Sequence, residues 1–264
     1  MSKMLKVLTT SVKIHSVYKA NIFFNIISMF TRILLAFILW GVAYESNSLI
    51  GGYTYNQMLL YYILSSFILQ LDKTDIIANS MAEEVQNGRF AKYIIMPINV
   101  KNYFLFYSLG DSFLNFLFSF ICCIGFIIFF GLRLSFTITA AHFLGLLVVI
   151  VLGILIMANI NFIIGTLAIK YYDITVFMMV KDNILSLITG SLLPLSLFPK
   201  GILNIMHFFP FYYIGYYPVN LLITGDVESI FMAACILTVW LFVLHLAATR
   251  LFKKYIMSYE GIGL

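Results

Sequence analysis

Six apolar stretches, each long enough to cross a bilayer as a helix, dominate the sequence. They cover residues 22–44, 55–78, 103–130, 139–169, 174–197 and 229–252. The hydrocarbon core of a bilayer is about 30 Å thick, and a helix crosses it in roughly 20 residues. A composition of 62% hydrophobic and 10% charged residues excludes an ordinary soluble domain. The sequence therefore predicts an all-α integral membrane protein with six transmembrane helices, in a single domain that covers residues 1–264.

The basic residues are distributed unevenly between the two sides that these spans define. Thirteen of the 16 lysines and arginines precede the first span, lie around the second and fourth connections, or follow the sixth span. Arg133 and Lys200 lie on the other side, and Arg32 lies within the first span. Since basic residues accumulate in cytoplasmic loops, both termini and the second connection are predicted to be cytoplasmic.

The N-terminal residues 1–20 mix four lysines with regularly spaced apolar side chains. This pattern is typical of a basic amphipathic helix that lies in the headgroup plane of a membrane. A frayed cytoplasmic tail is the alternative.

The second connection, residues 80–98, is the main polar segment between apolar stretches. Its charged side chains include Glu83, Glu84 and Arg89. Its apolar residues form two patches at helical spacing, Met81, Ala82 and Val85 and then Phe90, Tyr93 and Ile94. Gly88 separates the patches and Pro97 ends the pattern, so the sequence predicts two short amphipathic helices with a break at Gly88. A plain solvated connector would explain the charges but not the second apolar patch.

Among the charged residues inside predicted spans, we single out Arg32, Asp111, Lys181 and Asp182. Arg32 lies near the middle of the first span, where a cation facing lipid costs a few kcal/mol or more, so it should face protein or water. Its expected partner is Asp111, Asp182 or a carboxylate of another subunit. Lys181 and Asp182 are adjacent and do not share a helix face, so we expect each to pair with another element. These charges either fix helix packing or line a substrate path.

Residues 194–225 contain Pro194, Pro199, Pro210 and Pro218. So many prolines exclude one straight helix. The segment is nevertheless apolar and aromatic, which disfavours a free loop in water. One or two short helices that enter the outer leaflet and return satisfy both observations, so a re-entrant element is predicted at the outer face.

The order of these elements carries a family resemblance over nearly the whole chain. A basic N-terminus, six spans, a cytoplasmic E-E-V-x-x-G-R-F segment that ends in proline, GSLLPLSLFP and FPFYYIGYYP together resemble the type-2 permease subunits of ATP-binding-cassette (ABC) exporters. The resemblance implies a subunit of the bacterial plasma membrane, paired with a second permease subunit, the same or homologous. It implies that a separate ABC ATPase, in two copies, binds ATP and Mg²⁺.

In this family the segment after the second span is the coupling helix that contacts the ATPase. The resemblance therefore assigns coupling to Glu83, Glu84, Gly88, Arg89 and Pro97. It also assigns an outer gate to the re-entrant segment that contains Pro194, Pro199, Pro210 and Pro218.

The sequence contains no G-x-x-x-x-G-K-[ST] phosphate-binding loop, so ATP-derived energy would come from a partner. An ion-coupled secondary transporter that uses Arg32, Asp111, Lys181 and Asp182 is the main alternative. No internal repeat supports that alternative.

An enzyme is disfavoured, because His142, His207 and His245 are not part of an H-E-x-x-H pattern. We predict no catalytic, metal or cofactor site and no nucleic-acid partner. Membrane lipids surround the chain, and the transported molecule is open between a lipid, a peptide and a drug.

Overall fold

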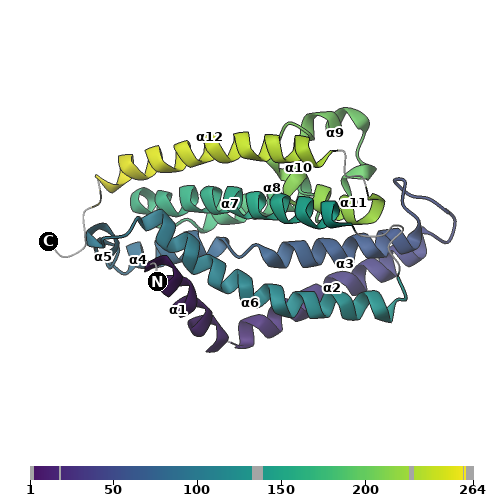
Figure 1. Ribbon diagram of the computed structural model, residues 1–264, viewed down its shortest axis with the longest axis horizontal. Helices are drawn as coiled ribbons and strands as arrows, with labels where there is room; N and C mark the ends of the chain where they lie inside the picture. Colours follow the sequence, from purple (N-terminus) through teal and green to yellow (C-terminus); the bar gives the residue numbers. More distant parts are fainter. Residues whose placement is uncertain (1–2, 18, 133–138, 226–228, 258, 260–264) are drawn as a thin grey trace.

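The computed structural model describes residues 3–17, 19–132, 139–225, 229–257 and 259 (Figure 1). These residues form helices joined by short connections. In chain order the helices are α1 (Lys3–Val17), α2 (Lys19–Ala43), α3 (Tyr55–Leu71), α4 (Asp75–Gln86), α5 (Ala91–Ile95), α6 (Val100–Phe129), α7 (Ala140–Tyr171), α8 (Thr175–Ile188), the 3-10 turn η1 (Leu195–Leu197), α9 (Lys200–Met206), α10 (Pro210–Ile214), α11 (Tyr216–Thr224) and α12 (Ile230–Ile256). The predicted all-α fold is confirmed for this part of the chain.

Four of the helices are long and apolar enough to cross a membrane. They are α2 from Ile22 onward, α6, α7 and α12. These helices match four of the predicted stretches within four residues at each end. The helices in the other two stretches are shorter, with 17 residues in α3 and 14 in α8. Four candidate spans are thus found among the described residues, and a six-span topology remains a prediction.

The two shorter helices correct the predicted limits of the second and fifth stretches. A single helix was expected over 55–78, but α3 ends at Leu71 and α4 begins at Asp75. The Asp72 carboxylate accepts hydrogen bonds from the Thr74 amide (2.9 Å) and hydroxyl (2.6 Å). Such a local side-chain bond competes with helix continuation. The predicted connection at 80–98 therefore belongs to a longer polar segment that begins with α4.

The fifth stretch was expected to be helical over 174–197, but α8 ends at Ile188. Gly190 lies two residues later with φ +76°, a left-handed conformation that glycine adopts readily. The Gly190 carbonyl accepts a hydrogen bond from the Tyr61 hydroxyl at 2.6 Å. The end of α8 is thereby attached to α3.

Helices α2, α3, α6, α7, α8 and α12 lie along the long axis of an elongated bundle (Figure 1). One end carries α4, α5 and the C-terminal end of α12. The opposite end carries the α2–α3 connection, α9 and α11. The predicted coupling segment and the predicted outer segment are therefore at opposite ends of the bundle.

Helix α1 forms over most of the predicted interfacial segment and packs along α6. The contact is close at Gly110, where an added Cβ would lie 2.6 Å from the Ser11 side chain. Ser11 is buried and donates a hydrogen bond to the Tyr107 carbonyl at 2.5 Å. The location of α1 in a headgroup plane remains a prediction.

Each proline of the 194–225 segment lies at the start of a short helix. Pro194 and Pro199 immediately precede η1 and α9, Pro210 is the first residue of α10, and Pro218 falls in the first turn of α11. Proline is tolerated there because the first-turn amides have no partner inside the helix. The expectation that this segment is not one straight helix is correct. Arg133, predicted near the outer edge, lies outside the described residues.

Candidate functional site

Helices α4 and α5 form a sharply bent unit, which we name the elbow segment (residues 75–97). Helix α4 ends in a two-bond C-terminal cap around Gly88, which has φ +68°. The Gly88 amide donates to the Val85 carbonyl (3.0 Å), and the Arg89 amide donates to the Glu84 carbonyl (2.8 Å). This pattern is the Schellman cap, in which glycine supplies the left-handed residue. The predicted break at Gly88 is present, and α5 ends just before Pro97.

The inner face of α4 packs on α7. Met81 and Ala78 are fully buried there, opposite Gly165 of α7. A Cβ added at Gly165 would lie 2.9 Å from the Met81 Sδ and 3.0 Å from the Ala78 Cα. The absence of a side chain at Gly165 thus allows α4 to lie directly against α7.

The second apolar patch of the elbow segment packs on the start of α6. Phe90 and Tyr93 are buried, and the Tyr93 ring lies 5.0 Å from that of Phe104. Burial raises the pKa of Tyr93, and its neighbour Tyr103 adds to this shift. Ile94, which was predicted in the same patch, is instead exposed. A helix of five residues makes little more than one turn, so its successive apolar side chains point in different directions and cannot all contact α6.

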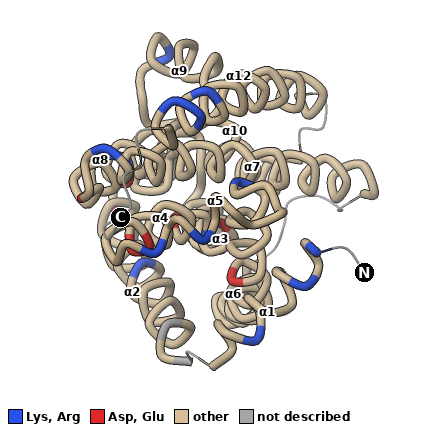
Figure 2. The backbone as a smooth tube through the Cα atoms, turned by 90° about the vertical axis from the view of Figure 1, so that its left-hand side faces the viewer, with Lys and Arg blue, Asp and Glu red and all other residues tan. Residues whose placement is uncertain are grey.

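The outer face of the elbow segment is charged and open. The side chains of Glu83 and Arg89 are 70% and 57% exposed. Glu84 lies deeper, with its carboxylate 2.7 Å from Lys92 Nζ and 3.5 Å from Arg89 Nε. These ion pairs join α4 to α5 across the bend. Figure 2 looks along the bundle from this end and shows basic and acidic residues of the elbow segment close together.

Exposed apolar residues follow the charged bend. Ile95 is 84% exposed, and Met96 is also exposed. Pro97 follows them on the surface. A charged surface beside an exposed apolar group is typical of a protein or membrane contact.

A hydrogen-bond network connects the start of α4 to α7 and α8. The Thr74 hydroxyl accepts a bond from Asn161 Nδ2 (2.8 Å), and the Asn161 carbonyl oxygen accepts one from Lys181 Nζ (2.8 Å). The α3–α4 junction is thereby held to two further helices.

Lys181 differs in part from its prediction. It does bond to another element through Asn161, but its ammonium also lies 2.9 Å from the Asp182 carboxylate. Adjacent residues point to different sides of a helix, but the lysine side chain is long enough to bend back and reach the neighbouring carboxylate. The Asp182 side chain is 64% exposed, against 9% for that of Lys181.

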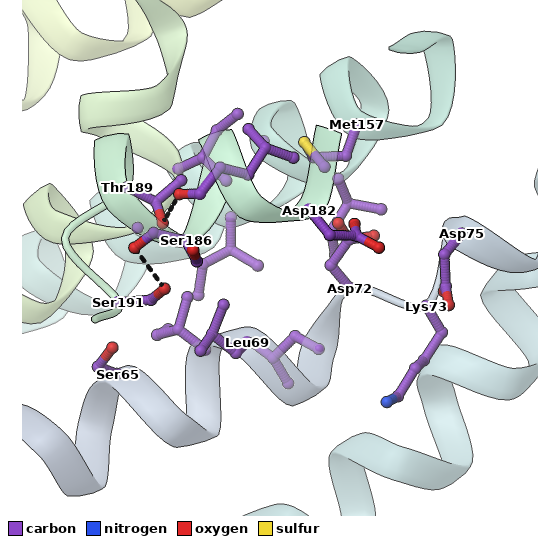
Figure 3. Close-up of a pocket in the computed structure, with 18 of the residues that line it drawn as sticks. Ser65, Leu69, Asp72, Lys73, Asp75, Met157, Asp182, Ser186, Thr189 and Ser191 are labelled. Carbon is purple, nitrogen blue, oxygen red and sulfur yellow. Dashed lines mark hydrogen bonds between the residues drawn. The ribbon is translucent and has the colours of Figure 1, made fainter. Parts of the chain in front are cut away.

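A cavity of about 290 Å³ lies beside this network. Figure 3 shows Asp72, Asp182 and Met157 at one end of it and Ser65 and Ser191 toward the other. Its charged lining residues are Arg32, Asp72, Lys73, Asp75, Lys181 and Asp182. Its remaining wall comes mainly from apolar residues of α3, α7 and α8. The cavity therefore combines three basic and three acidic side chains with apolar walls.

Arg32 and Asp111 do not pair with each other. Asp111 lies 3.4 Å from His15 Nδ1 and accepts a bond from Asn115 Nδ2 at 3.2 Å, so it joins α1 to α6. Arg32 lines the cavity, and within the described residues it has no ion pair with Asp111 or Asp182. Two of its three predicted partners are thus not found, and a carboxylate of another subunit remains the prediction.

The residues that sequence reasoning missed are polar side chains near helix starts. Asp173 accepts bonds from the Thr175 amide (2.8 Å) and hydroxyl (2.6 Å), as Asp72 does from Thr74. The same D-x-T pattern therefore starts both α8 and α4. This repeated pattern was the available signal, because an aspartate that bonds two residues ahead commonly precedes a helix.

Comparison with known proteins agrees with this architecture. No curated protein matches the sequence. The model of the ABC-2 family of transporter proteins matches residues 30–263, which include all of the elbow segment, the cavity-lining residues and the proline-rich segment. The chain is therefore a membrane protein of the ABC-2 transporter family.

Proposed function

We propose that this chain is the permease subunit of an ATP-driven ABC exporter, and that the elbow segment is the surface on which a separate ATPase acts. Two copies of the ATPase bind ATP and Mg²⁺, and this chain has no cofactor of its own. Closure of the two ATPase subunits on each other displaces the elbow segment and reorients the helices around the cavity.

The observation that carries the proposal is the division of the elbow segment into a buried face and a charged open face. The buried face contacts α6 and α7, so a force on the open face is transmitted to two long helices. The network from Thr74 through Asn161 to Lys181 extends this connection to α8. Glu83, Arg89 and the exposed Ile95–Pro97 segment form the contact surface, while Glu84 and Gly88 maintain the bend.

Replacement of Glu83 and Arg89 by alanine tests this assignment. The double variant should bind its ATPase about fivefold more weakly, because exposed charge pairs contribute up to about 1 kcal/mol. Binding and transport-coupled ATP hydrolysis are measured with the purified pair in nanodiscs. Glu45→Ala, an exposed glutamate before α3, serves as the control. Equal affinity for both variants contradicts the coupling surface, and transport driven by an ion gradient without the ATPase indicates a secondary carrier instead.

The cavity supports a path shared with a second permease subunit, the same or homologous. The Asp182 side chain is mostly exposed on α8, and the nearby Met179 and Val180 are also exposed. This surface therefore combines a carboxylate with apolar side chains that suit lipid. A carboxylate facing lipid costs a few kcal/mol at mid-membrane depth, so protein or water must cover this face. A second permease that completes the cavity supplies both.

Disulfide cross-linking tests the shared path. Met179→Cys, in a chain whose three native cysteines are replaced by serine, should cross-link to the second permease. Val239→Cys on α12 is the matched control, since it is similarly exposed and apolar. Equal cross-linking at both positions, or none at Met179→Cys, contradicts the proposed interface.

The proposal uses six spans in the bacterial plasma membrane, with both termini and the elbow segment in the cytoplasm. The basic residues support this orientation. Helix α3 is about 26 Å long and α8 about 21 Å, at a rise of 1.5 Å per residue. In this arrangement α8 crosses part of the bilayer, and Pro194, Pro199, Pro210 and Pro218 begin the helices of the outer re-entrant gate.

A further inference from the structure

A groove separates the first turns of α6 from the part of α12 that follows Leu237. It consists of two adjoining hollows of about 420 Å³ and 440 Å³. Both hollows include Lys101 and Asn102 of α6, Phe162 of α7 and His245 of α12. Helix α7 therefore forms the floor of one continuous surface feature, which we name the α6–α12 groove.

Lys101 lies in the middle of this groove without a carboxylate partner. Its ammonium donates to the side-chain oxygen of buried Asn159 and lies 2.8 Å from His245 Nδ1. Neither partner neutralises the lysine, because the amide of Asn159 is uncharged and the imidazole of His245 is either neutral or cationic. Within the described residues, no ion pair of Lys101 within 4.0 Å is present. A half-buried ammonium in this position favours an anion from outside the chain.

The charge of the groove has one sign. Lys101 and Lys253 line it together with His245, and no aspartate or glutamate is among its described lining residues. The cavity beside α8 differs, because acidic and basic side chains balance there. Charge complementarity therefore indicates an anionic occupant for the groove.

The walls of the groove change from polar to apolar along the bundle. Leu105 follows Lys101 by about one turn of α6, and Leu241 precedes His245 by about one turn of α12. Phe242 adds a large exposed ring at the same level. Both helices thus carry the charged residues nearer the α5 end and the apolar residues deeper in the bundle, which is the order of groups in a phospholipid.

We propose that the α6–α12 groove binds one phospholipid with an anionic headgroup. Its phosphate lies between Lys101 and Lys253, and an acyl chain extends along Leu105, Leu241 and Phe242. Tyr93 and Ile94 of α5 close the headgroup end, so the bound lipid contacts the elbow segment. Basic pockets between membrane helices are suited to such headgroups. This site requires only a membrane and does not depend on the proposed ATPase.

Lipid titration of the purified protein tests the site. The protein in nanodiscs of phosphatidylcholine is titrated with phosphatidylglycerol, and the lipid that stays bound after extraction is counted by native mass spectrometry. Lys101→Gln and Lys253→Gln should each weaken retention of phosphatidylglycerol about fivefold, because a lysine near an anionic lipid contributes about 1 kcal/mol. Lys101→Arg keeps the charge and should retain the lipid.

Lys254→Gln is the matched control, because Lys254 is the exposed neighbour of Lys253 and does not line the groove. It should leave retention unchanged. The proposal is overturned if all three glutamine variants lose lipid equally, if phosphatidylcholine is retained as well as phosphatidylglycerol, or if no lipid is retained. Lys253→Gln keeps the test decisive if Lys101→Gln does not fold, because Lys253 is exposed.

Discussion

Gln86 and Tyr172 hold each other by reciprocal hydrogen bonds between the elbow segment and the α7–α8 turn. Gln86 Nε2 donates to the Tyr172 carbonyl, and the Tyr172 hydroxyl donates to the Gln86 carbonyl, each at 3.0 Å. Tyr172 has φ 65° and ψ −51°, a sparsely populated backbone conformation that costs a non-glycine residue roughly 1–3 kcal/mol. These two bonds therefore compensate a strained backbone at the point where α4 meets the start of α8.

Tyr172→Phe should loosen this junction. The variant loses one of the two bonds, which contributes about 1 kcal/mol or less at an exposed position. We expect faster hydrogen–deuterium exchange at the end of α4 and the start of α8, and weaker coupling to the ATPase. Tyr171→Phe, on the same turn, is the control. Unchanged exchange in the Tyr172 variant would show that the junction does not depend on this bond.

Gly88→Ala should stiffen and distort the elbow. An alanine at φ +68° costs about 1 kcal/mol relative to glycine. Gly131 is a matched control, because it has φ +62° and caps the end of α6 in the same way. The Gly131 amide donates to the Ile128 carbonyl, and the Leu132 amide donates to the Ile127 carbonyl. Both alanine variants should lower the apparent Tm similarly. Only Gly88→Ala should impair ATPase coupling, and equal impairment by both would refute a specific role for the elbow.

Local patterns in the sequence were sufficient to predict the elbow. Glycine between two apolar patches and proline after the second predicted the break and the end of α5, because both residues act on their own backbone. The patterns could not predict which apolar residues become buried. Phe90 and Tyr93 are buried, with Tyr93 against Phe104 of α6, whereas Ile94 of the same turn is exposed. That difference depends on the location of a neighbouring helix.

The partners of charged residues were harder to predict for the same reason. Arg32 had three possible carboxylates, and the fold places Asp111 against His15 and Asp182 beside Lys181 instead. Pairing between helices depends on how each helix is rotated about its axis and on how deep each residue lies in the bundle. A hydropathy profile contains neither kind of information. The end of α3 was missed because hydropathy averages over Asp72 and Thr74, although their D-x-T pattern competes locally with the helix.

Asn161→Ala should destabilise the network beneath the cavity. Lys181 would lose a buried neutral partner while keeping its charge, and Thr74 would lose a donor. Leaving such groups without their partner costs about 1–3 kcal/mol. The apparent Tm in detergent should fall by several degrees. Asn183→Ala, on the exposed side of α8, should change it little. A similar Tm for both variants would exclude a structural role for the network.

Gly165→Ala tests how directly α4 rests on α7. The added methyl group would lie 3.0 Å from the Ala78 Cα, a backbone atom that cannot move without the helix, and 2.9 Å from the Met81 Sδ. Overpacking of this kind costs about 1–3 kcal/mol, so the variant should lower the apparent Tm and weaken ATPase coupling.

Gly201→Ala is the corresponding control, because nothing lies within 4 Å of its added methyl group. It should leave the Tm unchanged or raise it slightly, since alanine favours a helix more than glycine does. Met81→Ala in the Gly165→Ala background removes the sulfur contact but leaves the contacts with the Ala78 Cα and with the Cβ at position 81, which lies 3.1 Å away. Partial recovery of coupling is therefore expected in this double variant. Full recovery would show that the Met81 side chain alone, and not the position of the α4 backbone, limits how closely α4 approaches α7.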